Sequence, residues 1–522
     1  MDKVRLGQID GTLVVLYLLG VMALGLWMSR GVKSSKDFFL AGRSLPWWAV
    51  ALSLVVSDIG AKDMIGVAAD SYRYGAVMMN FDFIGCSLAV LVAAFLFMPF
   101  FWMAGIYTIP EYLGRRYNRH VRRFFAVVWT LFMLATLGTI FVSAAAMFEV
   151  LLGWPFWFSV GVTAAMVAIY TTVGGLKAVV VTDALSCVVL IVGAALICWI
   201  GLSEFDGWNA MQETIRGMDA AWTAHHFDLV PPADHPKYSW PAVFLGLALV
   251  LGPSYWIGNQ AIVQRNFGTR SENDARAAYV LCAAIKMLFP LLLVIPGLIA
   301  LALFHEQLGV PFVDGNLAAP DGNWQGNHVL PLLVVKLLPT GVLGIVVGAF
   351  LAGVLSNLDS YVNSASTLVV TDLYKPLVRP GATDRECLVL GRVLVVAFVV
   401  LGAGASYLVD RWFESVFDAF QTFLSFFQGS LLALLLLGML WRRTTQWGGL
   451  AGMFVGVGVA ALVQFHRPLL GWEGETSFLW VAWWSFVAAV ISAVVVSLFT
   501  TPYDRQRLRG LVCWIPNKEP TS

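Results

Sequence analysis

Long apolar runs recur along the whole chain, and they constrain its fold more than any other feature. Thirteen runs are each long enough for a helix to cross a hydrocarbon core of about 30 Å, which takes ~20 residues. They cover residues 10–28, 47–70, 76–103, 122–152, 156–173, 176–201, 239–259, 275–304, 340–373, 386–409, 412–440, 446–464 and 478–500. The runs are continuous and lack the alternation of membrane strands, so they predict an all-α polytopic membrane protein.

The composition agrees with this prediction and excludes several other classes. Of the 522 residues, 59% are hydrophobic and only 12% are charged, whereas soluble proteins carry roughly 25% charged residues. The net charge of +1 gives no indication of a nucleic-acid partner. We therefore expect a protein that lies in a lipid bilayer, binds no nucleic acid and functions as a monomer.

Basic residues are distributed unevenly between the two sides of the membrane. With the amino terminus outside, the inside segments, counted with the ends of the runs that adjoin them, hold 23 Lys and Arg residues, and the outside segments hold 8. The positive-inside rule therefore predicts an external amino terminus and a cytoplasmic carboxy terminus. The two remaining basic residues, Lys62 and Lys286, lie within apolar runs.

The cysteines and glycosylation signals favour a bacterial inner membrane. All six cysteines lie in apolar runs or on the predicted inside, and the chain has no Asn-x-Ser/Thr acceptor site. A eukaryotic cell-surface protein commonly carries external disulfides and such acceptor sites. The first run has no small-residue cleavage site, so we expect it to be a retained helix.

Two of the runs contain helix breakers, which suggests an internal repeat. The run 47–70 is interrupted by Gly60 among polar residues, and the run 239–259 contains Gly252 and Pro253. Broken helices at matching places in two halves indicate an inverted-repeat transporter with its site near the midplane. The predicted division is 1–46 (an extra helix and a cytoplasmic loop), 47–201 (the first five-helix repeat), 202–238 (an external loop), 239–440 (the second repeat, with an external loop at 305–339), 441–500 (two peripheral helices) and 501–522 (a cytoplasmic tail).

Ionisable residues within the apolar runs cost at least ~2.5 kcal/mol each at the bilayer centre. Eight of them are the candidates for buried functional groups: Asp58, Lys62, Asp63, Asp82, Glu149, Asp183, Lys286 and Asp359. Six acids against two bases favour a bound cation. For Glu149, near a helix end, we expect a structural ion pair, and a local i, i+4 pair between Asp58 and Lys62 is an open alternative.

The run 340–373 concentrates the oxygen-bearing side chains that a hard cation prefers. They are Ser356, Asn357, Asp359, Ser360, Asn363, Ser364, Ser366 and Thr367. Gly353, Ser356 and Asn357 follow i, i+3, i+4 spacing and can face one broken neighbouring helix. For the stretch 364–367 we expect ordinary polar contacts between helices.

Several segments together resemble the sodium/solute symporter family, which includes the sodium/glucose, sodium/galactose and sodium/proline symporters. They are FFLAGRSLPWW (38–48), SDIG (57–60), VGGLKAVVVTDALS (173–186), YWIGNQAIVQR (255–265), IKMLFPLLLVIPG (285–297) and the stretch of the ninth run that ends in TDLYK. The resemblance covers nearly the whole chain and implies a five-plus-five, LeuT-like inverted repeat with alternating access. It implies no enzymatic chemistry and no cofactor other than Na⁺ as the coupling ion.

The resemblance also implies cation sites. Its principal Na⁺ site corresponds to Val56, Ile59, Gly353, Ser356 and Asn357, where Asn357 replaces the usual Ser or Thr. A second cation site of some members corresponds to Asp183, Asp359 and Ser360. Here the extra carboxylate of Asp359 leaves two alternatives, a stronger cation site or a proton shared with Asp183.

The resemblance maps a solute pocket with partial agreement. By it, Asp82, Lys286, Gln421 and Tyr255 correspond to sugar-contacting positions, and Phe81, Trp256 and Phe417 to a gate. Asp58, Lys62 and Asp63 make the pocket more highly charged than a neutral sugar requires, and Lys62 has no family counterpart. We expect Asp58, Asp63 and Lys62 to contact the solute.

These observations predict a symporter that couples inward Na⁺ movement to uptake of a small polar solute, with a sugar or polyol favoured. Uptake of an amino acid, a sugar acid or another organic anion, coupled to Na⁺ or H⁺, is the alternative. A transporter-like membrane sensor is a weaker alternative, since about twenty residues follow the last run.

Overall fold

The computed structural model describes residues 6–28, 34–106, 108–218, 223–235, 237–309, 324, 326–413, 415–466 and 477–513. Parts of the predicted external loops and the last nine residues of the predicted tail therefore lie outside the described residues. Within these ranges the regular structure is helical, apart from one isolated bridge between Leu45 and Thr269. The predicted all-α fold is confirmed.

Most of the described residues belong to long helices or to shorter helices that continue one another. These are α1 (Gln8–Met28), α3 (Trp47–Asp58), α4 (Ala61–Tyr74), α5 (Asn80–Asp82), α6 (Leu88–Val92), α7 (Met98–Ala104), α9 (Arg119–Leu152), α10 (Phe156–Ser203), α12 (Trp240–Ala242), α13 (Gly252–Gly258), α14 (Gln260–Phe267), α15 (Glu272–Lys286), α16 (Phe289–Leu308), α18 (Val342–Leu368), α20 (Asp384–Trp412), α21 (Val416–Leu440), α22 (Gln446–Phe465) and α23 (Phe478–Phe499).

Short helices and π-helical segments complete this set. The short helices are α2 (Ser35–Leu40), α8 (Ile109–Arg116), α11 (Trp208–Arg216), α17 (Val329–Leu337) and α19 (Lys375–Leu377), and the 3₁₀ turns are η2 (Ala41–Arg43), η3 (Gly75–Met79) and η8 (Gly326–His328). The π-helical segments are η4 (Phe83–Ser87), η5 (Ala93–Phe97), η7 (Val243–Leu251) and η9 (Val369–Tyr374). Such segments inside longer helices are common at functional sites.

Eleven helical stretches within the described residues are long and apolar enough to cross a membrane. This confirms a multi-pass membrane protein, while the count of thirteen crossings stays a prediction. The two counts differ because the predicted runs and the helices do not correspond one to one. For example, the predicted runs 156–173 and 176–201 both fall within α10, and the run 47–70 is divided between α3 and α4.

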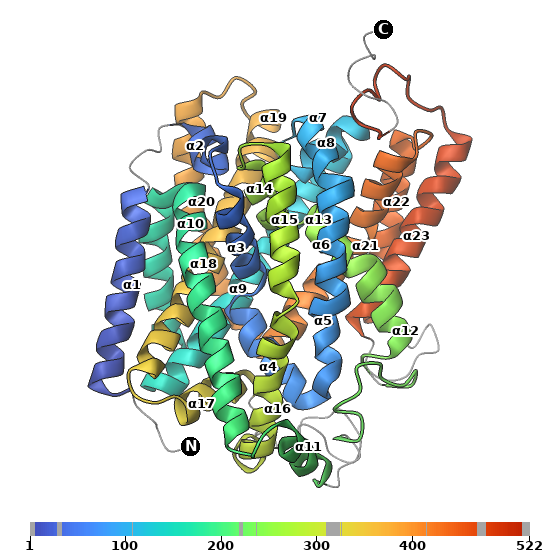
Figure 1. The fold of residues 1–522 in the computed structure, drawn as a ribbon. Helices are drawn as coiled ribbons and strands as arrows, with labels where there is room; N and C mark the ends of the chain where they lie inside the picture. The colour runs from blue at the N-terminus through green and yellow to red at the C-terminus, as the bar shows by residue number, and fades with distance from the viewer. Residues whose placement is uncertain are drawn as a thin grey trace.

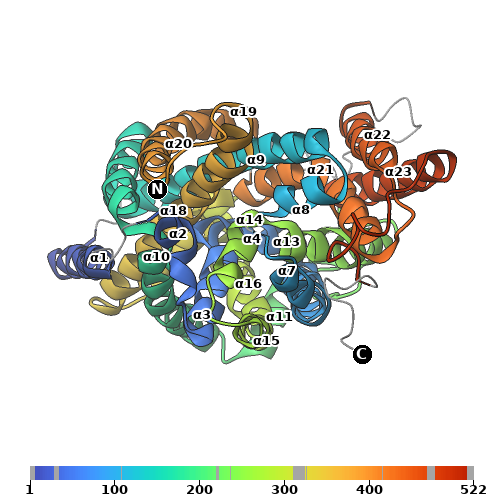
Figure 2. The same cartoon turned by 90° about the horizontal axis from the view of Figure 1, so that it is seen from above.

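The long helices form one bundle, with the first and the last helices at its margins. In Figure 1, α1 begins on the face that carries α11 and α17, and α23 ends on the opposite face. Seen from above, α1 lies at one edge and α22 and α23 at the other, while α4, α13 and α18 lie between them (Figure 2). The central helices are therefore the ones that can enclose a site.

The first predicted break is present between α3 and α4. Ile59 (φ −91°, ψ 83°) and Gly60 (φ −97°, ψ −170°) leave the helical conformation between Asp58 and Ala61. The carbonyl of Val56 loses its usual helical partner because the N–H of Gly60 donates instead to Asp58 O at 3.2 Å. The break therefore exposes main-chain polar groups inside the bundle.

The second break lies at Asn259, so its prediction at Gly252 and Pro253 is wrong. Gly252 keeps helical angles (φ −58°, ψ −59°), whereas Asn259 (φ −72°, ψ 114°) is extended between α13 and α14. The Asn259 side chain accepts a hydrogen bond from the N–H of Ala261 at 3.0 Å, so it caps α14. Gly252 serves close packing instead, because a Cβ there would lie 2.0 Å from the carbonyl oxygen of Gly85.

Candidate functional site

A cavity lies beside the break between α3 and α4. Its wall includes every predicted solute and gate residue except Lys62: Asp58, Asp63, Phe81, Asp82, Tyr255, Trp256, Lys286, Phe417 and Gln421. These side chains come from α3, α4, α5, α13, α15 and α21. The mixture of aromatic and charged groups suits a small polar ligand.

Lys286 connects two carboxylates on one side of the cavity. Its ammonium group forms ion pairs with Asp58 and with Asp82. Lys286 is only 1% exposed, so these charged partners compensate its burial. The thiol of Cys86 also approaches Asp58 Oδ2, with the sulfur 3.9 Å away. Asp58, Asp82 and Cys86 cluster closely enough to hold a metal ion, but a lysine ammonium already joins the two carboxylates.

Lys62 lies behind the cavity wall, at the start of α4. Its ammonium pairs with Asp63, lies 3.3 Å from the main-chain oxygen of Asp58 and lies 3.9 Å from the ring centroid of Phe420. The alternative of a side-chain pair with Asp58 is therefore wrong, because the Asp58 carboxylate pairs with Lys286 across the bundle. Lys62 thus holds Asp63 in position and places a cation against an aromatic ring.

Aromatic rings cover one end of the cavity. Phe81 and Phe417 meet edge to face, with ring centroids 5.0 Å apart at 85°. Tyr238 and Phe478 pack against Phe81 at 5.8 and 6.1 Å. Trp256 belongs to a different part of the wall, where it packs against Tyr255.

A loop residue ties this cover to the bundle. Lys237, near the end of the predicted external loop at 202–238, pairs with Asp418 in the first turn of α21, next to Phe417. Burial lowers the pKa of Lys237, but Asp418, Tyr74 and Asp70 together outweigh this effect, so the pKa lies above its usual value. The neighbouring hydroxyl of Tyr238 donates to Asp70 at 3.2 Å.

The opposite side of the break meets α18. The amide nitrogen of Asn357 donates to the Val56 carbonyl at 2.7 Å, and the other amide atom, Oδ1, is buried without a hydrogen-bond partner among the described residues. Gly60 allows this approach, because a Cβ at position 60 would lie 2.4 Å from Asn357. A buried carbonyl and a buried amide oxygen at one junction are suitable ligands for a small cation.

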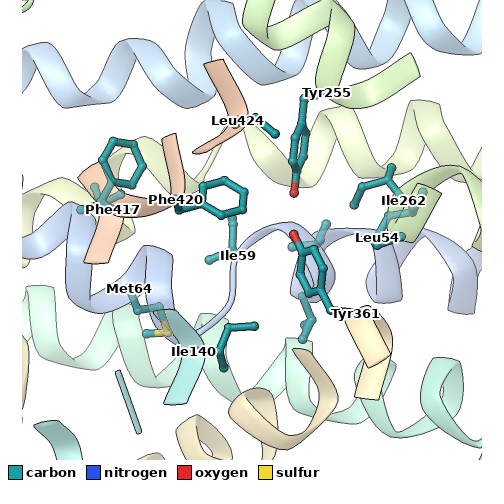
Figure 3. Packing of buried hydrophobic residues seen from close by; sticks show 14 of the residues in the cluster. Leu54, Ile59, Met64, Ile140, Tyr255, Ile262, Tyr361, Phe417, Phe420 and Leu424 are labelled. Atoms are coloured by element: carbon teal, nitrogen blue, oxygen red, sulfur yellow. The ribbon is translucent and has the colours of Figure 1, made fainter. Parts of the chain in front are cut away.

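The other predicted Na⁺ ligands lie in different environments. Ile59 is in the break itself, beside the cavity. In Figure 3 it lies on the non-helical loop between Phe420 and a pair of tyrosines, Tyr255 and Tyr361, whose hydroxyl groups point toward each other. Gly353 faces α10, where an added Cβ would lie 3.2 Å from Leu190.

Ser356 turns toward a second buried cluster, centred on Asp183. The Asp183 carboxylate accepts hydrogen bonds from the hydroxyls of Ser356 and Ser53, the latter at 2.5 Å. The Arg265 guanidinium lies 3.7 Å from Asp183 and donates to Ser53 at 2.9 Å and to Ser360. The predicted second cation site therefore already contains a guanidinium cation. Asp359 is also fully buried.

The sequence interpretation did not identify Ser53 and Arg265 as site residues. The predicted seventh run ends at residue 259, which leaves Arg265 in an inside loop, whereas in the structure it lies in α14 and is 1% exposed. Asn259 offered a signal, since Asn is a preferred N-cap residue and a helix after it carries Arg265 back into the bundle. Nothing local marks Ser53 among the other small residues of its helix.

Glu149 lies apart from both clusters. It is near the end of α9, its side chain is 57% exposed, and one of its oxygens lies 3.6 Å from His328 Nε2. This geometry agrees with the expected structural pair near a helix end.

Comparison with known proteins adds to this geometry. The profile of the "Sodium:solute symporter family" matches residues 38–456. The "Sodium/glucose cotransporter" of Vibrio parahaemolyticus is 30% identical over 473 residues, covering 88% of this chain and 86% of that protein. The human "Sodium/myo-inositol cotransporter" is 29% identical, covering 97% of this chain and 75% of that protein.

Solved structures support the same fold. The structure of a Na⁺-coupled sialic acid symporter in a substrate-bound outward-open state superimposes with a TM-score of 0.79 at 19% identity, covering 95% of this chain and 99% of that one. A nucleobase-cation-symport-1 family transporter superimposes with a TM-score of 0.55 at 11% identity, covering 91% and 97%. At these identities the similarity concerns the fold alone, and it agrees with the predicted inverted-repeat architecture.

Proposed function

The chain belongs to the sodium:solute symporter family, and we propose that it uses inward Na⁺ movement to drive uptake of a small polar organic solute. The observation that carries this proposal is the cavity beside the break, where buried charged groups border empty space. Broken helices supply main-chain groups for ions, and the adjacent cavity accepts the solute. The geometry involves no covalent step.

For the solute we favour a sugar or polyol scaffold. Asp82, Lys286 and Gln421 offer hydrogen-bond acceptors and donors beside the aromatic side chains of Tyr255 and Phe420, which suits a molecule with several hydroxyl groups. Relatives named as glucose and myo-inositol cotransporters support this choice. Uptake of an amino acid, a sugar acid or another organic anion is the alternative, and a membrane sensor is a weaker one.

For the ion we propose one Na⁺ at the junction of the first break and α18, bound by Val56, Ile59, Gly353, Ser356 and Asn357. The buried Asn357 Oδ1 supports this site, because it has no hydrogen-bond partner among the described residues. At Asp183, Asp359 and Ser360 we propose no second Na⁺. The Arg265 guanidinium already supplies positive charge there.

The proposed transport cycle couples the two ligands through the broken helix. Na⁺ joins the main chain of α3 to α18, which orders the break and positions Asp58 and Asp63 at the cavity. Solute binding then favours closure of Phe81 and Phe417, with Trp256 as part of the wall that moves. By linkage, Na⁺ and solute must raise each other's affinity by the same factor.

For the cellular setting we propose a bacterial inner membrane, an external amino terminus, a cytoplasmic carboxy terminus and a functional monomer. The excess of basic residues on the predicted inside supports this orientation. The cover formed by Phe81 and Phe417 then lies toward the outside. The division into two five-helix repeats, two external loops and peripheral helices belongs to the same proposal.

Uptake into proteoliposomes tests the function directly. The purified chain is reconstituted, and accumulation of labelled sugars, polyols, amino acids and sugar acids is measured with an imposed Na⁺ gradient, an imposed H⁺ gradient, or neither. We expect accumulation only with Na⁺, abolished by a sodium ionophore. Uptake that follows the H⁺ gradient and ignores Na⁺ contradicts the ion assignment, and binding without any accumulation favours the sensor.

A further inference from the structure

The charged side chains at the cavity do not balance one another. Asp58, Asp63 and Asp82 contribute three carboxylates, whereas Lys62 and Lys286 contribute two ammonium groups. Each lysine contacts at least one carboxylate, and all five residues lie in the interior of the bundle. Two ammonium groups thus serve three carboxylates, so the five side chains carry one excess negative charge, and excess charge away from water is costly.

The proposed Na⁺ does not remove this excess, because the neighbouring cluster around Asp183 has an excess negative charge of its own. There Asp183 and Asp359 face one cation among the described residues, Arg265, and both carboxylates are fully buried. Ser356 bonds to Asp183, and its neighbour Asn357 bonds to the Val56 carbonyl at the first break. These two residues therefore link the Na⁺ site to that cluster. With both carboxylates ionised, one Na⁺ at this junction balances that cluster and leaves the cavity with its negative charge.

The cavity carboxylates also retain free acceptor positions. On Asp58, the Lys286 ammonium and the Cys86 thiol both contact Oδ2. On Asp63, the Lys62 ammonium and the Gly60 N–H both contact Oδ2. The contacts of both aspartates with described residues thus fall on one oxygen each. The second oxygens need hydrogen-bond donors, and an ammonium group supplies three donors together with the missing charge.

We propose that the solute carries one positive charge, as an amine on a hydroxyl-bearing scaffold such as an amino sugar or amino polyol. This inference rests on the proposed function and narrows its solute class. A neutral polyol leaves the cavity with an uncompensated carboxylate, and an organic anion adds a further negative group near Asp58 and Asp82. The aromatic wall also favours a cation over a carboxylate.

Electrogenic currents from matched solutes test the charge. Proteoliposomes on a solid-supported membrane receive D-glucosamine, D-glucose or D-glucuronate, which share a ring and differ in charge, in NaCl and in choline chloride. Glycerol, 2-amino-1,3-propanediol and glycerate form a second, smaller set. We expect the amine of at least one set to give a Na⁺-dependent current at a concentration at least tenfold lower than its neutral and anionic counterparts need.

Substitutions that change only the cavity charge sharpen the test. Asp58→Asn removes the excess negative charge, so the preference for the amine should fall by at least tenfold and the neutral member should become the better solute. Gln421→Glu adds a charge and should increase the preference for the amine. The matched control is Asp372→Asn, which removes a buried carboxylate of η9 that pairs with Arg122 outside the cavity wall, and which should leave the order of preference unchanged.

The possible outcomes separate this inference from the proposed function. Na⁺-dependent currents with a neutral or anionic member in preference to its amine overturn the positive charge but leave Na⁺-coupled symport standing. An unchanged order of preference in Asp58→Asn also overturns it, because the excess charge then has no role in selection. If no member of either set gives a Na⁺-dependent current, the sugar or polyol scaffold fails and the inference fails with it.

Discussion

Two clusters of buried charge lie on opposite sides of the same broken helix, and they differ in what surrounds them. The cluster of Asp58, Asp82 and Lys286 borders a cavity. The cluster of Asp183 and Arg265 is filled by the protein, with hydroxyl groups of Ser53, Ser356 and Ser360 as partners. Charged groups beside empty space can exchange partners with a ligand, whereas charged groups enclosed by protein partners hold helices together.

The largest expected effect comes from removing the cation of the cluster formed by Asp183 and Arg265. Arg265→Met leaves the Asp183 carboxylate buried without its cation, which should cost about 3–5 kcal/mol of stability. Thermal unfolding of the purified protein should show a Tm lower by several degrees, and Na⁺-driven uptake should be lost.

Arg265→Lys is the matched control for this cluster. It keeps the charge but loses the planar fork that reaches Asp183 and Ser360 together, so an intermediate Tm is expected. If Arg265→Met unfolds at the wild-type temperature, the guanidinium is not structural and the contrast between the two clusters is wrong.

Removing Asp58 should abolish coupled uptake with less damage to the fold. In Asp58→Ala, Lys286 keeps Asp82 as a partner, while the cavity loses a carboxylate next to the break. Labelled uptake should fall to background while the Tm stays closer to wild type than that of Arg265→Met. Transport at a near-normal rate would show that Asp58 has a structural role.

Gly60→Ala tests the contact between the break and α18. A Cβ at this position meets Asn357 at 2.4 Å, so the side chain must withdraw from the Val56 carbonyl. We expect the Na⁺ concentration for half-maximal uptake to rise at least tenfold, about 1.4 kcal/mol. An unchanged Na⁺ dependence would remove Asn357 and Val56 from the ion site.

Asp82→Ala tests whether the cavity separates solute from ion. Asp82 pairs with Lys286 on the cavity side, whereas the junction at Asn357 lies on the other side of α3. Solute affinity should therefore fall several times more than Na⁺ affinity, as measured by uptake at varied concentrations of each. The reverse order would place Asp82 with the ion.

The smallest effect is expected outside both clusters. Glu149 is 57% exposed and pairs with His328 near a helix end, where such contacts add little. Glu149→Gln should change stability by less than ~0.5 kcal/mol and leave uptake unchanged. A large loss would extend functional coupling to the end of α9.

Much of the candidate site could be predicted because its signals are local. Gly60 lies among polar residues within an apolar run, and charged residues inside such runs are conspicuous, which pointed to Asp58, Asp63 and Lys286. Their partners were harder to assign. Spacing on one helix suggested a pair between Asp58 and Lys62, but Asp58 bonds to Lys286, 228 positions away in the sequence.

The missed features all depend on how helices meet. Gly252 and Pro253 are residues that often break a helix. Here Gly252 stays helical, and its missing side chain allows close contact with the main chain of Gly85. Arg265 follows a predicted membrane crossing, so the sequence places it in a loop. In the structure it donates a hydrogen bond to Ser53, 212 positions away in the chain. No local pattern could identify these contacts.

The sequence alone determined the membrane class, the helical architecture, the first break and the charged residues of the cavity. These depend on the length of apolar runs against the bilayer thickness and on the backbone freedom of glycine, both of which act within a few residues. Only the tertiary structure decided which charges pair, where the second helix breaks and which cluster borders open space. In a low-dielectric interior each buried charge takes the partner that packing brings within contact, and packing joins residues far apart in the chain.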